Sequence, residues 1–306
     1  MPEERLPPDE RPPRTAQPRD DATLSAVLRR AADQLGRAGI PDPSVDAELL
    51  AAHVLGTGRG GVQAAALRGD VLAAAQLGRL EAALARRAAR EPLQHITGTA
   101  PFRHLELSVG PGVFVPRPET EIVAQLAIDA LRAAASPAPI AVDLGAGSGA
   151  IALAMATEVP HARVYAAENS PDAFPWTRRN VERAGADNLT LVLADLADAF
   201  GELDGTVAVV ASNPPYVPDD AIPRDPEVRL FDPPAALYGG PDGLDVVRVL
   251  SRTGLRLAHP GGLLVVEHGE WQGEAIRAIL AADGWRGAAT HRDLTLRDRA
   301  TTALRP

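Results

Sequence analysis

The stretch IAVDLGAGSG, residues 140–149, decides the fold of this chain. Its apolar first half, Ile140–Leu144, is predicted to form a buried strand, and the glycines that follow allow a tight turn from strand into helix. The N–H groups at the start of that helix are available to bind a ligand. The candidate binding residues of this turn are Gly145, Ala146, Gly147, Ser148 and Gly149.

A carboxylate at the end of the next expected strand indicates a nucleoside ligand. Glu168 lies nineteen residues after Gly149, where an acid can accept hydrogen bonds from both ribose hydroxyls. Gly145, Gly147 and Ala150 also satisfy the dinucleotide fingerprint, whose third position accepts Ala. A nicotinamide-dependent dehydrogenase therefore stays open on this motif alone.

Short apolar runs alternate with helical stretches from about residue 137 onward, which is typical of a doubly wound, Rossmann-like α/β sheet. The further expected strands are Val164–Ala167, Leu189–Leu193, Val207–Val210 and Leu263–Val266. Ahead of the sheet, Phe102–Val109, a turn at Gly110–Gly112 and Val113–Val115 are interpreted as a β-hairpin. We expect this hairpin to connect the sheet to the preceding part of the chain.

The N-terminal third has a different character. Residues 22–92 are rich in Ala and Leu at helical spacing, which predicts a small helical bundle. Residues 1–21 contain six Pro and few apolar side chains, so we expect a disordered leader. The expected organisation is a leader (1–21), a helical domain (22–92), a linker with the hairpin (93–116) and an α/β domain (117–306).

Composition removes several classes of chemistry. All 31 basic residues are Arg and there is no Lys or Cys, which excludes a lysine Schiff base, a thiolate nucleophile and a cysteine-ligated metal site. The seven His are widely spaced, so no metal is expected, and no apolar run is long enough to predict a membrane span. Residues 101–306 hold 27 acidic residues against 18 Arg, which disfavours tight binding to a phosphate backbone.

The motif Asn213-Pro214-Pro215-Tyr216 separates the candidate chemistries. Its prolines fix the backbone and remove two N–H donors, and each residue before a proline is held extended. The Asn213 side-chain oxygen and the Pro214 carbonyl can then accept both hydrogens of one NH₂ group. A transferase acting on a planar amide or aromatic amine needs such a loop, whereas a dehydrogenase does not.

Together these motifs resemble the S-adenosyl-L-methionine-dependent release-factor glutamine methyltransferases of the HemK/PrmC type, over about 280 residues. Further stretches that carry the resemblance are Glu91–Gly98, Val115–Glu121, Asp242–Asp245, Glu267–Gly269 and Gln272–Gly273. The resemblance implies a seven-stranded class I methyltransferase domain behind a helical domain that docks the substrate. It also implies methylation of the side-chain amide nitrogen (N5) of the glutamine in the Gly-Gly-Gln loop of class I peptide chain release factors.

The resemblance also implies roles for individual residues. The implied cofactor-binding residues are Gly145, Ala146, Gly147, Ser148 and Gly149 for the methionine part, Glu168 for the ribose, Asp195 and Leu196 beside the adenine, and Asn213. The implied substrate-binding residues are Asn213, Pro214, Pro215 and Tyr216. Of these, Asn213, Pro214 and Tyr216 are the implied catalytic residues.

Three residues depart from the family pattern. Leu196 stands where many members have Trp, so an aliphatic contact to adenine is expected in place of stacking. Pro175 falls in an expected early turn of a helix, where it would kink that helix. Leu296 stands at a usual Gly, and we expect it to alter a turn between the final strands.

Other readings remain open at this point. The substrate could be a glutamine of a ribosomal protein, the chain could be an amino-methyltransferase acting on adenine in nucleic acid, or it could be a non-catalytic binding module. Arg86, Arg87 and Arg90 are interpreted as a solvated helix face, with contact to an acidic release-factor patch as the alternative, and His268 as structural. We expect a cytoplasmic monomer that contacts neither nucleic acid nor membrane directly.

Overall fold

The computed structural model describes residues 22–306. The expected leader at residues 1–21 therefore lies outside the described residues. The described chain forms two compact units that adjoin in sequence between Arg90 and Glu91. Within residues 22–306, no helix combines the length and apolar character that a membrane crossing requires.

The first unit is helical, as its composition predicts. Its helices are α1 (Leu24–Arg37), α2 (Pro43–Leu55), α3 (Arg59–Leu67) and α4 (Ala74–Ala88). The interpretation of Arg86, Arg87 and Arg90 as one solvated helix face is wrong at two positions. Arg87 is buried and pairs with Asp46 of α2, with its Nε 2.7 Å from Oδ2, and Arg90 donates to the Gly39 carbonyl. The buried Arg87 needs this partner and joins α4 to α2, while the half-buried Arg90 joins the end of α4 to the loop after α1. Of the three, only Arg86 is exposed.

The second unit begins with α5 (Leu93–Thr97) and a two-stranded hairpin of β1 (Thr99–Phe102) and β2 (Leu105–Ser108). The hairpin turn lies at Arg103 and His104, so the prediction that the hairpin turns at Gly110–Gly112 is wrong. Arg103 adopts a left-handed φ of 52°. Its backbone N–H donates to Glu121, and its guanidinium bonds Glu158. These bonds hold in place a turn that Arg would otherwise disfavour.

Residues 113–115, which follow the hairpin, are not a strand. Val113 and Val115 are fully buried and pack with Val109 and Ala173, so their apolar character reflects core packing. The Gly110–Gly112 segment does turn, with Gly112 at φ 90°. Trp176 covers this turn and donates its indole N–H to the Pro111 carbonyl.

The rest of the second unit is a seven-stranded mixed sheet in the order β5-β4-β3-β6-β7-β9-β8, with β9 antiparallel to its neighbours. The Rossmann-like class and all five expected strands are confirmed. The strands are β3 (Ile140–Leu144), β4 (Arg163–Glu168), β5 (Leu189–Leu193), β6 (Val207–Ser212), β7 (Ala258–Glu267), β8 (Arg286–Arg292) and β9 (Asp298–Leu304).

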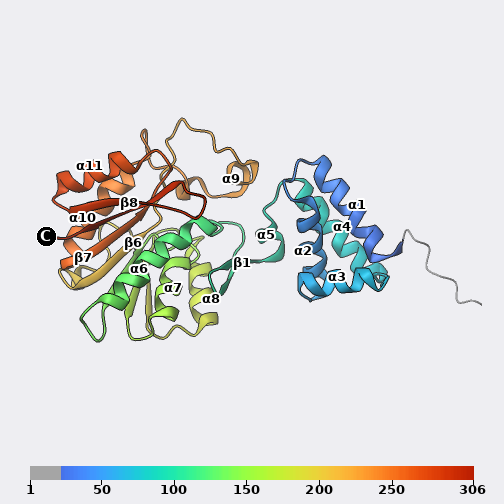
Figure 1. Ribbon diagram of the computed structural model, residues 1–306, viewed down its shortest axis with the longest axis horizontal. Coiled ribbons are helices and arrows are strands. Elements are labelled where there is room, and N and C mark those ends of the chain that lie inside the picture. Colours follow the sequence, from blue (N-terminus) through green and yellow to red (C-terminus); the bar gives the residue numbers. More distant parts are fainter. Residues whose placement is uncertain (1–21) are drawn as a thin grey trace, which may run out of the picture. The chain divides into compact units, whose positions relative to one another are not determined.

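Helices cover both faces of this sheet (Figure 1). On one face lie η2 (Pro118–Thr120, a 3₁₀ turn), α6 (Glu121–Ala133), α7 (Ala150–Glu158) and α8 (Phe174–Ala184). On the other lie α10 (Asp245–Leu257) and α11 (Gly273–Asp283), while α9 (Pro226–Phe231) belongs to the excursion between β6 and α10. A hydrophobic core lies on each face of the sheet, and alternate residues of a strand point to opposite faces. In β3, Ala141 packs in the core with α6 and α7, while Val142 and Leu144 pack in the core with α10 and α11.

The expectation of a kink at Pro175 is wrong. Helix α8 begins at Phe174, so Pro175 lies in its first turn, where no intrahelical N–H bond is lost and no kink is needed. Another departure, Leu296, lies in the turn between β8 and β9. It adopts a left-handed φ of 65°, and the Asp293 carboxylate accepts N–H bonds from Thr295 and Arg297 to hold that turn.

Candidate active site

The carboxyl ends of β3 and β6 lie side by side at the centre of the sheet. From β3 the chain proceeds to β4 and β5 on one side, and from β6 to β7 on the other. Open α/β sheets bind ligands where the strand order reverses in this way. The glycine turn follows β3 and the Asn213–Tyr216 loop follows β6, so the fold brings the two predicted motifs together.

The glycine turn leaves β3 in a conformation that only glycine adopts readily. Gly145, Gly147 and Gly149 have φ of 81°, 57° and 84°. A Cβ built at Gly145 or Gly147 would meet no atom within 4 Å, so both glycines border open space. Ala146 and Ser148 are buried, and the Ser148 carbonyl accepts from Asn180 of α8. The turn thus exposes backbone to a ligand while α8 holds it from behind.

Glu168 lies at the end of β4 with its carboxylate against the glycine turn. It is 6% exposed, and its two oxygens accept N–H bonds of 2.7 Å from Gly147 and 2.8 Å from Ser170. Each carboxylate oxygen has further acceptor capacity. The expected ribose acid therefore also fixes the shape of the glycine turn, which the sequence alone did not indicate.

Asp143 is a second buried acid of this edge, and sequence reasoning gave it no role. Its Oδ2 accepts the Ala152 N–H of α7 at 2.9 Å, while Oδ1 is buried without a partner among the described residues. Burial and the nearby Glu168 charge together raise the pKa of Asp143 to about 7, against the opposing effect of the hydrogen bond from Ala152. Its position directly before the glycine turn, in the quoted motif, is the signal that could have singled it out.

Asp195 and Leu196 follow β5 at the same edge of the sheet. Asp195 is exposed and turns back on its own loop, where its Oδ1 accepts the Ala197 N–H at 2.9 Å. Leu196 is half-buried and packs against the core beneath α10 and α11. These two residues lie beyond Glu168 along the edge, at the far end from Asn213.

The acceptor loop begins where β6 ends. Ser212 is fully buried, and its hydroxyl donates to the Leu144 carbonyl, which ties the loop to the strand of the glycine turn. The half-buried Asn213 donates through Nδ2 to Thr120 Oγ1 at 3.3 Å. In residues 22–306 no hydrogen bond occupies Asn213 Oδ1 or the Pro214 carbonyl. Both acceptors are thus available to a donor outside the chain.

The outer half of the loop is held through its backbone. Gln272 accepts the Gly269 N–H and donates to the Tyr216 carbonyl at 2.9 Å. A Cβ at Gly243 would lie 2.2 Å from that same carbonyl oxygen, so only glycine allows the approach. The motif stretches Asp242–Asp245 and Gln272–Gly273 therefore support the acceptor loop.

Tyr216 and Glu267 meet behind the loop. The Tyr216 hydroxyl makes a long hydrogen bond of 3.4 Å to Glu267 Oε1, and burial raises the pKa of Tyr216. Burial also raises the pKa of Glu267, to about 7, while the Thr120 hydroxyl and Arg299 oppose that shift. The next residue, His268, is fully buried with bonds to Gly269 and Thr301, as expected for a structural histidine.

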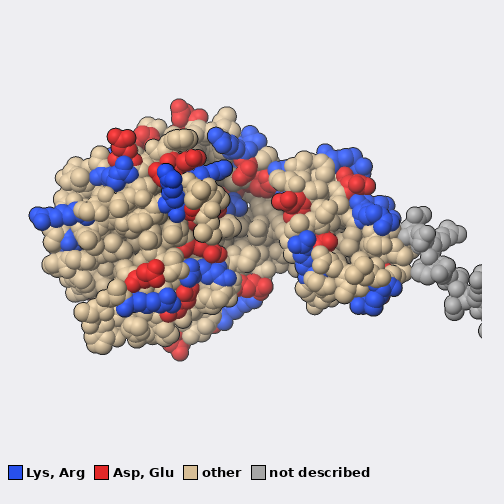
Figure 2. Space-filling view, in the orientation of Figure 1, with Lys and Arg blue, Asp and Glu red and all other residues tan. Residues whose placement is uncertain are grey.

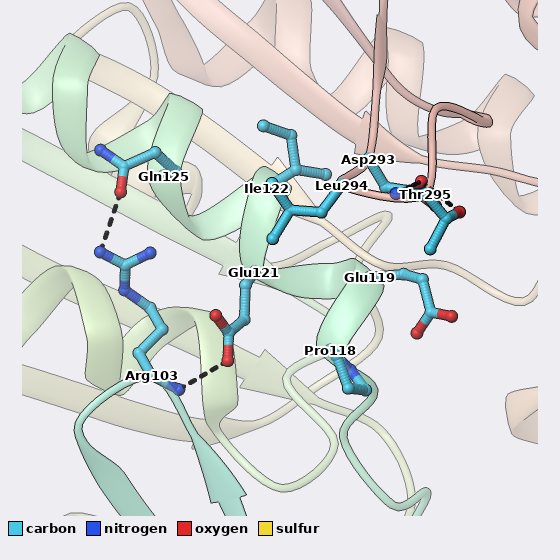
Figure 3. A pocket seen from close by; sticks show the side chains of 9 residues that line it. All are labelled: Arg103, Pro118, Glu119, Glu121, Ile122, Gln125, Asp293, Leu294 and Thr295. Atoms are coloured by element: carbon cyan, nitrogen blue, oxygen red, sulfur yellow. Dashed lines mark hydrogen bonds between the residues drawn. The ribbon is translucent and has the colours of Figure 1, made fainter.

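A pocket of about 250 Å³ opens beside η2 (Figure 3). It lies between the start of α6 and the turn that contains Asp293–Thr295, and Figure 3 shows Arg103 bonded to Glu121 and Gln125 at its rim. Glu119 lines this pocket, whereas the adjacent Thr120 is buried toward Asn213. The η2 turn therefore separates the pocket from the acceptor loop.

Known proteins match this chain in sequence along nearly its whole length. Residues 26–98 match the PrmC N-terminal domain, and residues 104–233 match the methyltransferase small domain. The release factor glutamine methyltransferase of Streptomyces coelicolor is 51% identical over 282 residues, which cover 92% of this chain and 97% of that protein. A 4-amino-L-phenylalanine/4-methylamino-L-phenylalanine methyltransferase of Streptomyces pristinaespiralis is 40% identical, with 92% and 95% covered.

A solved structure agrees on the fold alone. The hMettl16 catalytic domain, crystallised with the MAT2A 3′UTR hairpin 6, aligns with a TM-score of 0.52 at 14% identity. The alignment covers 64% of this chain and 75% of that one. The second unit of this chain therefore shares its fold with that domain.

Proposed function

This chain belongs to the family of release factor glutamine methyltransferases, and from that premise we propose its substrate, cofactor and site residues. It transfers a methyl group from S-adenosyl-L-methionine to the side-chain amide nitrogen (N5) of the glutamine in the Gly-Gly-Gln loop of class I peptide chain release factors. Relatives from several bacteria are named release factor glutamine methyltransferase, and this chain aligns with nearly their whole length.

One observation carries the proposal from the site itself. Asn213 Oδ1 and the Pro214 carbonyl are adjacent acceptors, both left open, at the point where the strand order reverses. A primary amide has two N–H donors on one nitrogen, and the pair of acceptors matches them. A substrate without an NH₂ group would leave both of these oxygens without a hydrogen bond, which disfavours binding of that substrate.

The residues at this edge fit the nucleoside cofactor. The open space at Gly145 and Gly147 admits the methionine part against bare backbone, and Glu168 keeps acceptor capacity for the ribose hydroxyls. Asp195 and Leu196 lie further along the edge, where the adenine would rest. When bound, S-adenosyl-L-methionine supplies an electrophilic methyl group on a sulfonium.

The chain's own residues make the amide nitrogen reactive. Its lone pair is delocalised, so it is a poor nucleophile in water. Hydrogen bonds to Asn213 Oδ1 and the Pro214 carbonyl orient the nitrogen and favour the positive charge that develops on it, as preorganised dipoles do in other sites. Methyl transfer leaves the nitrogen with a positive charge and both of its hydrogens, and this cation is strongly acidic, so one proton leaves to solvent and the neutral methylamide remains. Much of the rate gain is positional. The Tyr216 ring forms a wall for the glutamine side chain.

The charge distribution favours a protein substrate over a nucleic acid. On the face shown in Figure 2, the described Arg side chains are interspersed with Asp and Glu, without a continuous basic surface. Nucleic-acid enzymes gain most of their affinity from such a surface. We propose that the enzyme acts on release factors in the cytoplasm, with residues 22–92 as the docking domain, in line with its relatives.

Transfer of labelled methyl from S-adenosyl-L-methionine to a purified class I release factor tests this function. The expected result is labelling of the wild-type factor and none of a factor whose loop Gln is changed to Ala. Free 4-amino-L-phenylalanine serves as the competing amine, because a relative of this chain carries that activity in its name. Equal labelling of the Gln-to-Ala factor, or preference for the free amine, would contradict the proposal.

A further inference from the structure

The pocket beside the acceptor loop has no role in the chemistry described so far. It has a volume of about 250 Å³ and lies between the start of α6 and the turn that joins β8 to β9 (Figure 3). Glu119 of η2 lines this pocket, and the next residue, Thr120, accepts a hydrogen bond of 3.3 Å from Asn213. The pocket and the acceptor loop are therefore neighbours on the two sides of one 3₁₀ turn.

Part of the pocket wall is apolar and open to solvent. Leu294, in the β8–β9 turn, is 101% exposed, so its side chain packs on nothing in the described chain. Pro118 is also exposed, and Ile122 is half-buried. Single exposed apolar side chains are common, but apolar side chains that line a pocket next to a reaction site indicate a surface that a ligand covers.

Arginines that lie around the pocket already have carboxylate partners of their own. These ion pairs are Arg103–Glu158, Arg117–Asp232 and Arg299–Asp293. Within residues 22–306, no hydrogen bond or ion pair engages the carboxylate of Glu119, and the bonds drawn in Figure 3 reach Glu121 and Asp293 instead. The pocket therefore has one carboxylate that is left to attract a cation, beside apolar walls that strengthen this attraction.

This combination fits a lysine or arginine side chain. Such a side chain packs its apolar stem against apolar surface while its charged head stays near water. An anionic ligand would be repelled by Glu119, and a purely apolar one would remove water from that carboxylate without supplying a counter-ion. The nearest source of a basic side chain is the protein that presents the methyl acceptor, because its chain continues on both sides of the modified residue.

An extended chain reaches from the acceptor loop to the pocket in a few residues. It advances about 3.3 Å per residue, and one helical turn with its side chains is roughly 10 Å across, so about three residues cross η2. A basic residue within about five positions of the modified glutamine is thus close enough to enter the pocket.

We propose that this pocket binds a lysine or arginine side chain of the protein substrate, with Glu119 pairing with the cation and with Ile122 and Leu294 contacting its apolar stem. The bound residue lies on the same segment as the methyl-accepting glutamine. The proposal rests on the function proposed above and adds a contact that selects the substrate without touching the reacting atoms. It implies that the enzyme recognises the sequence around the glutamine, in addition to the glutamine amide itself.

Steady-state kinetics test the two kinds of contact separately. Glu119→Gln removes the charge and Leu294→Ser removes the apolar contact. In each variant the KM for release factor should rise roughly three- to fivefold, the value of one partly exposed contact, while kcat changes less than about twofold. The matched controls are exposed residues away from the pocket, Glu202→Gln and Leu304→Ser, which should keep the wild-type KM. A wild-type KM in either Glu119→Gln or Leu294→Ser would overturn the proposal.

A charge swap identifies the residue that enters the pocket. In release factor, each Lys or Arg within about five positions of the loop glutamine is changed to Glu, one at a time. One of these factors should be methylated poorly by the wild-type enzyme and better by the Glu119→Arg enzyme, whereas the unaltered factor should show the opposite order. If Glu119→Arg improves transfer to none of the altered factors, the pocket does not bind a basic side chain of the substrate.

Binding of a small probe separates this inference from the proposed function. N-acetyl-arginine amide is compared with N-acetyl-citrulline amide, which has nearly the same shape without the charge. The ¹³C-methyl signals of Ile122 and Leu294, assigned by their loss in Ile122→Val and Leu294→Ser, should shift with the arginine probe and much less with the citrulline probe. Equal shifts with both probes, or no shift with either, would contradict the role of the pocket. Absence of methyl transfer to release factor by a wild-type enzyme that still binds the arginine probe would bear on the proposed function alone.

Discussion

At the scale of single residues, the polarity of one amide decides what the acceptor loop can bind. Asn213 has its nitrogen turned toward Thr120, and its oxygen and the Pro214 carbonyl remain open. The two prolines after Asn213 remove donors that would otherwise compete for the same site. The sequence predicted this loop because its chemistry is local, contained in four consecutive residues.

Removal of the Asn213 amide should cost catalysis without costing the fold. For Asn213→Ala we expect the barrier to rise by about 2.7–4 kcal/mol, as when one preorganised polar group is lost from other active sites. Single-turnover methyl transfer to release factor measures this change, with calorimetry confirming that S-adenosyl-L-methionine still binds. Near-normal turnover by a variant that still binds cofactor would show that Asn213 does not accept the proposed hydrogen bond from the substrate amide.

Leu296 offers a prediction about stability that does not involve the site. Its φ of 65° strains a side chain that is 75% exposed, so the strain is not offset by burial. Leu296→Gly should raise the free energy of unfolding by roughly 0.5–1 kcal/mol, the relief of left-handed strain less the entropy of glycine. Urea denaturation measures it. Leu294→Gly in the same turn is the control and should give no gain, because Leu294 has no positive φ.

Residues distant in sequence were beyond prediction. Thr120 belongs to η2 and Asn213 to the loop after β6, and only the packed fold brings these two into hydrogen-bond contact. Asp143 stood within a quoted motif, yet its burial and its bond to Ala152 depend on the seating of α7. A sequence pattern shows which residues have the side-chain chemistry for a role, and packing determines which of these side chains come into contact.

At the scale of elements, the strands of the sheet were predictable and the hairpin was not. Strands buried on both faces form continuous apolar runs, as in Ile140–Leu144 and Val207–Val210, so their position is clear from the sequence. The hairpin turn at Arg103 has no glycine, and contacts with Glu121 and Glu158 from other elements hold it. The Gly-Pro-Gly segment has the residues that favour a hairpin turn, and predictions from neighbouring residues do not include contacts with residues distant in sequence.

The glycine turn allows a matched pair of substitutions. Gly147 and Gly185 have nearly equal φ, 57° and 60°, and an added Cβ meets no atom at either. Gly147→Ala and Gly185→Ala should each lower the unfolding free energy by about 1 kcal/mol through left-handed strain. Only Gly147→Ala should weaken binding of S-adenosyl-L-methionine, as measured by calorimetry. Equal affinity in the two variants would place the cofactor elsewhere.

At the scale of the whole molecule, two buried acids make stability depend on pH. Burial raises the pKa of Asp143 and of Glu267 to about 7, above the values of about 4 that they have in an unfolded chain. Between these values the folded state binds more protons than the unfolded one. Their contribution to stability is therefore present below about pH 4 and is lost as pH rises to 7.

Glu267→Gln should remove one of these two contributions. Relative to wild type, the variant should be more stable at pH 8 than at pH 5, with a difference on the order of 3 kcal/mol. Thermal unfolding at both pH values measures the difference. The change of an exposed acid to its amide, Glu202→Gln, is the control for the substitution itself. A Glu267→Gln variant whose relative stability is the same at both pH values would contradict an acid held uncharged by burial.

The measurement that tests the central claim most directly is mass-spectrometric mapping of the methyl group on a class I release factor. After incubation with this enzyme and S-adenosyl-L-methionine, fragments of the Gly-Gly-Gln peptide should carry one added methyl on the glutamine side chain. The Asn213→Ala enzyme should leave the same peptide almost unmodified over the same time. A methyl group found on another residue, or an unmodified glutamine after prolonged incubation with the wild-type enzyme, would contradict the account.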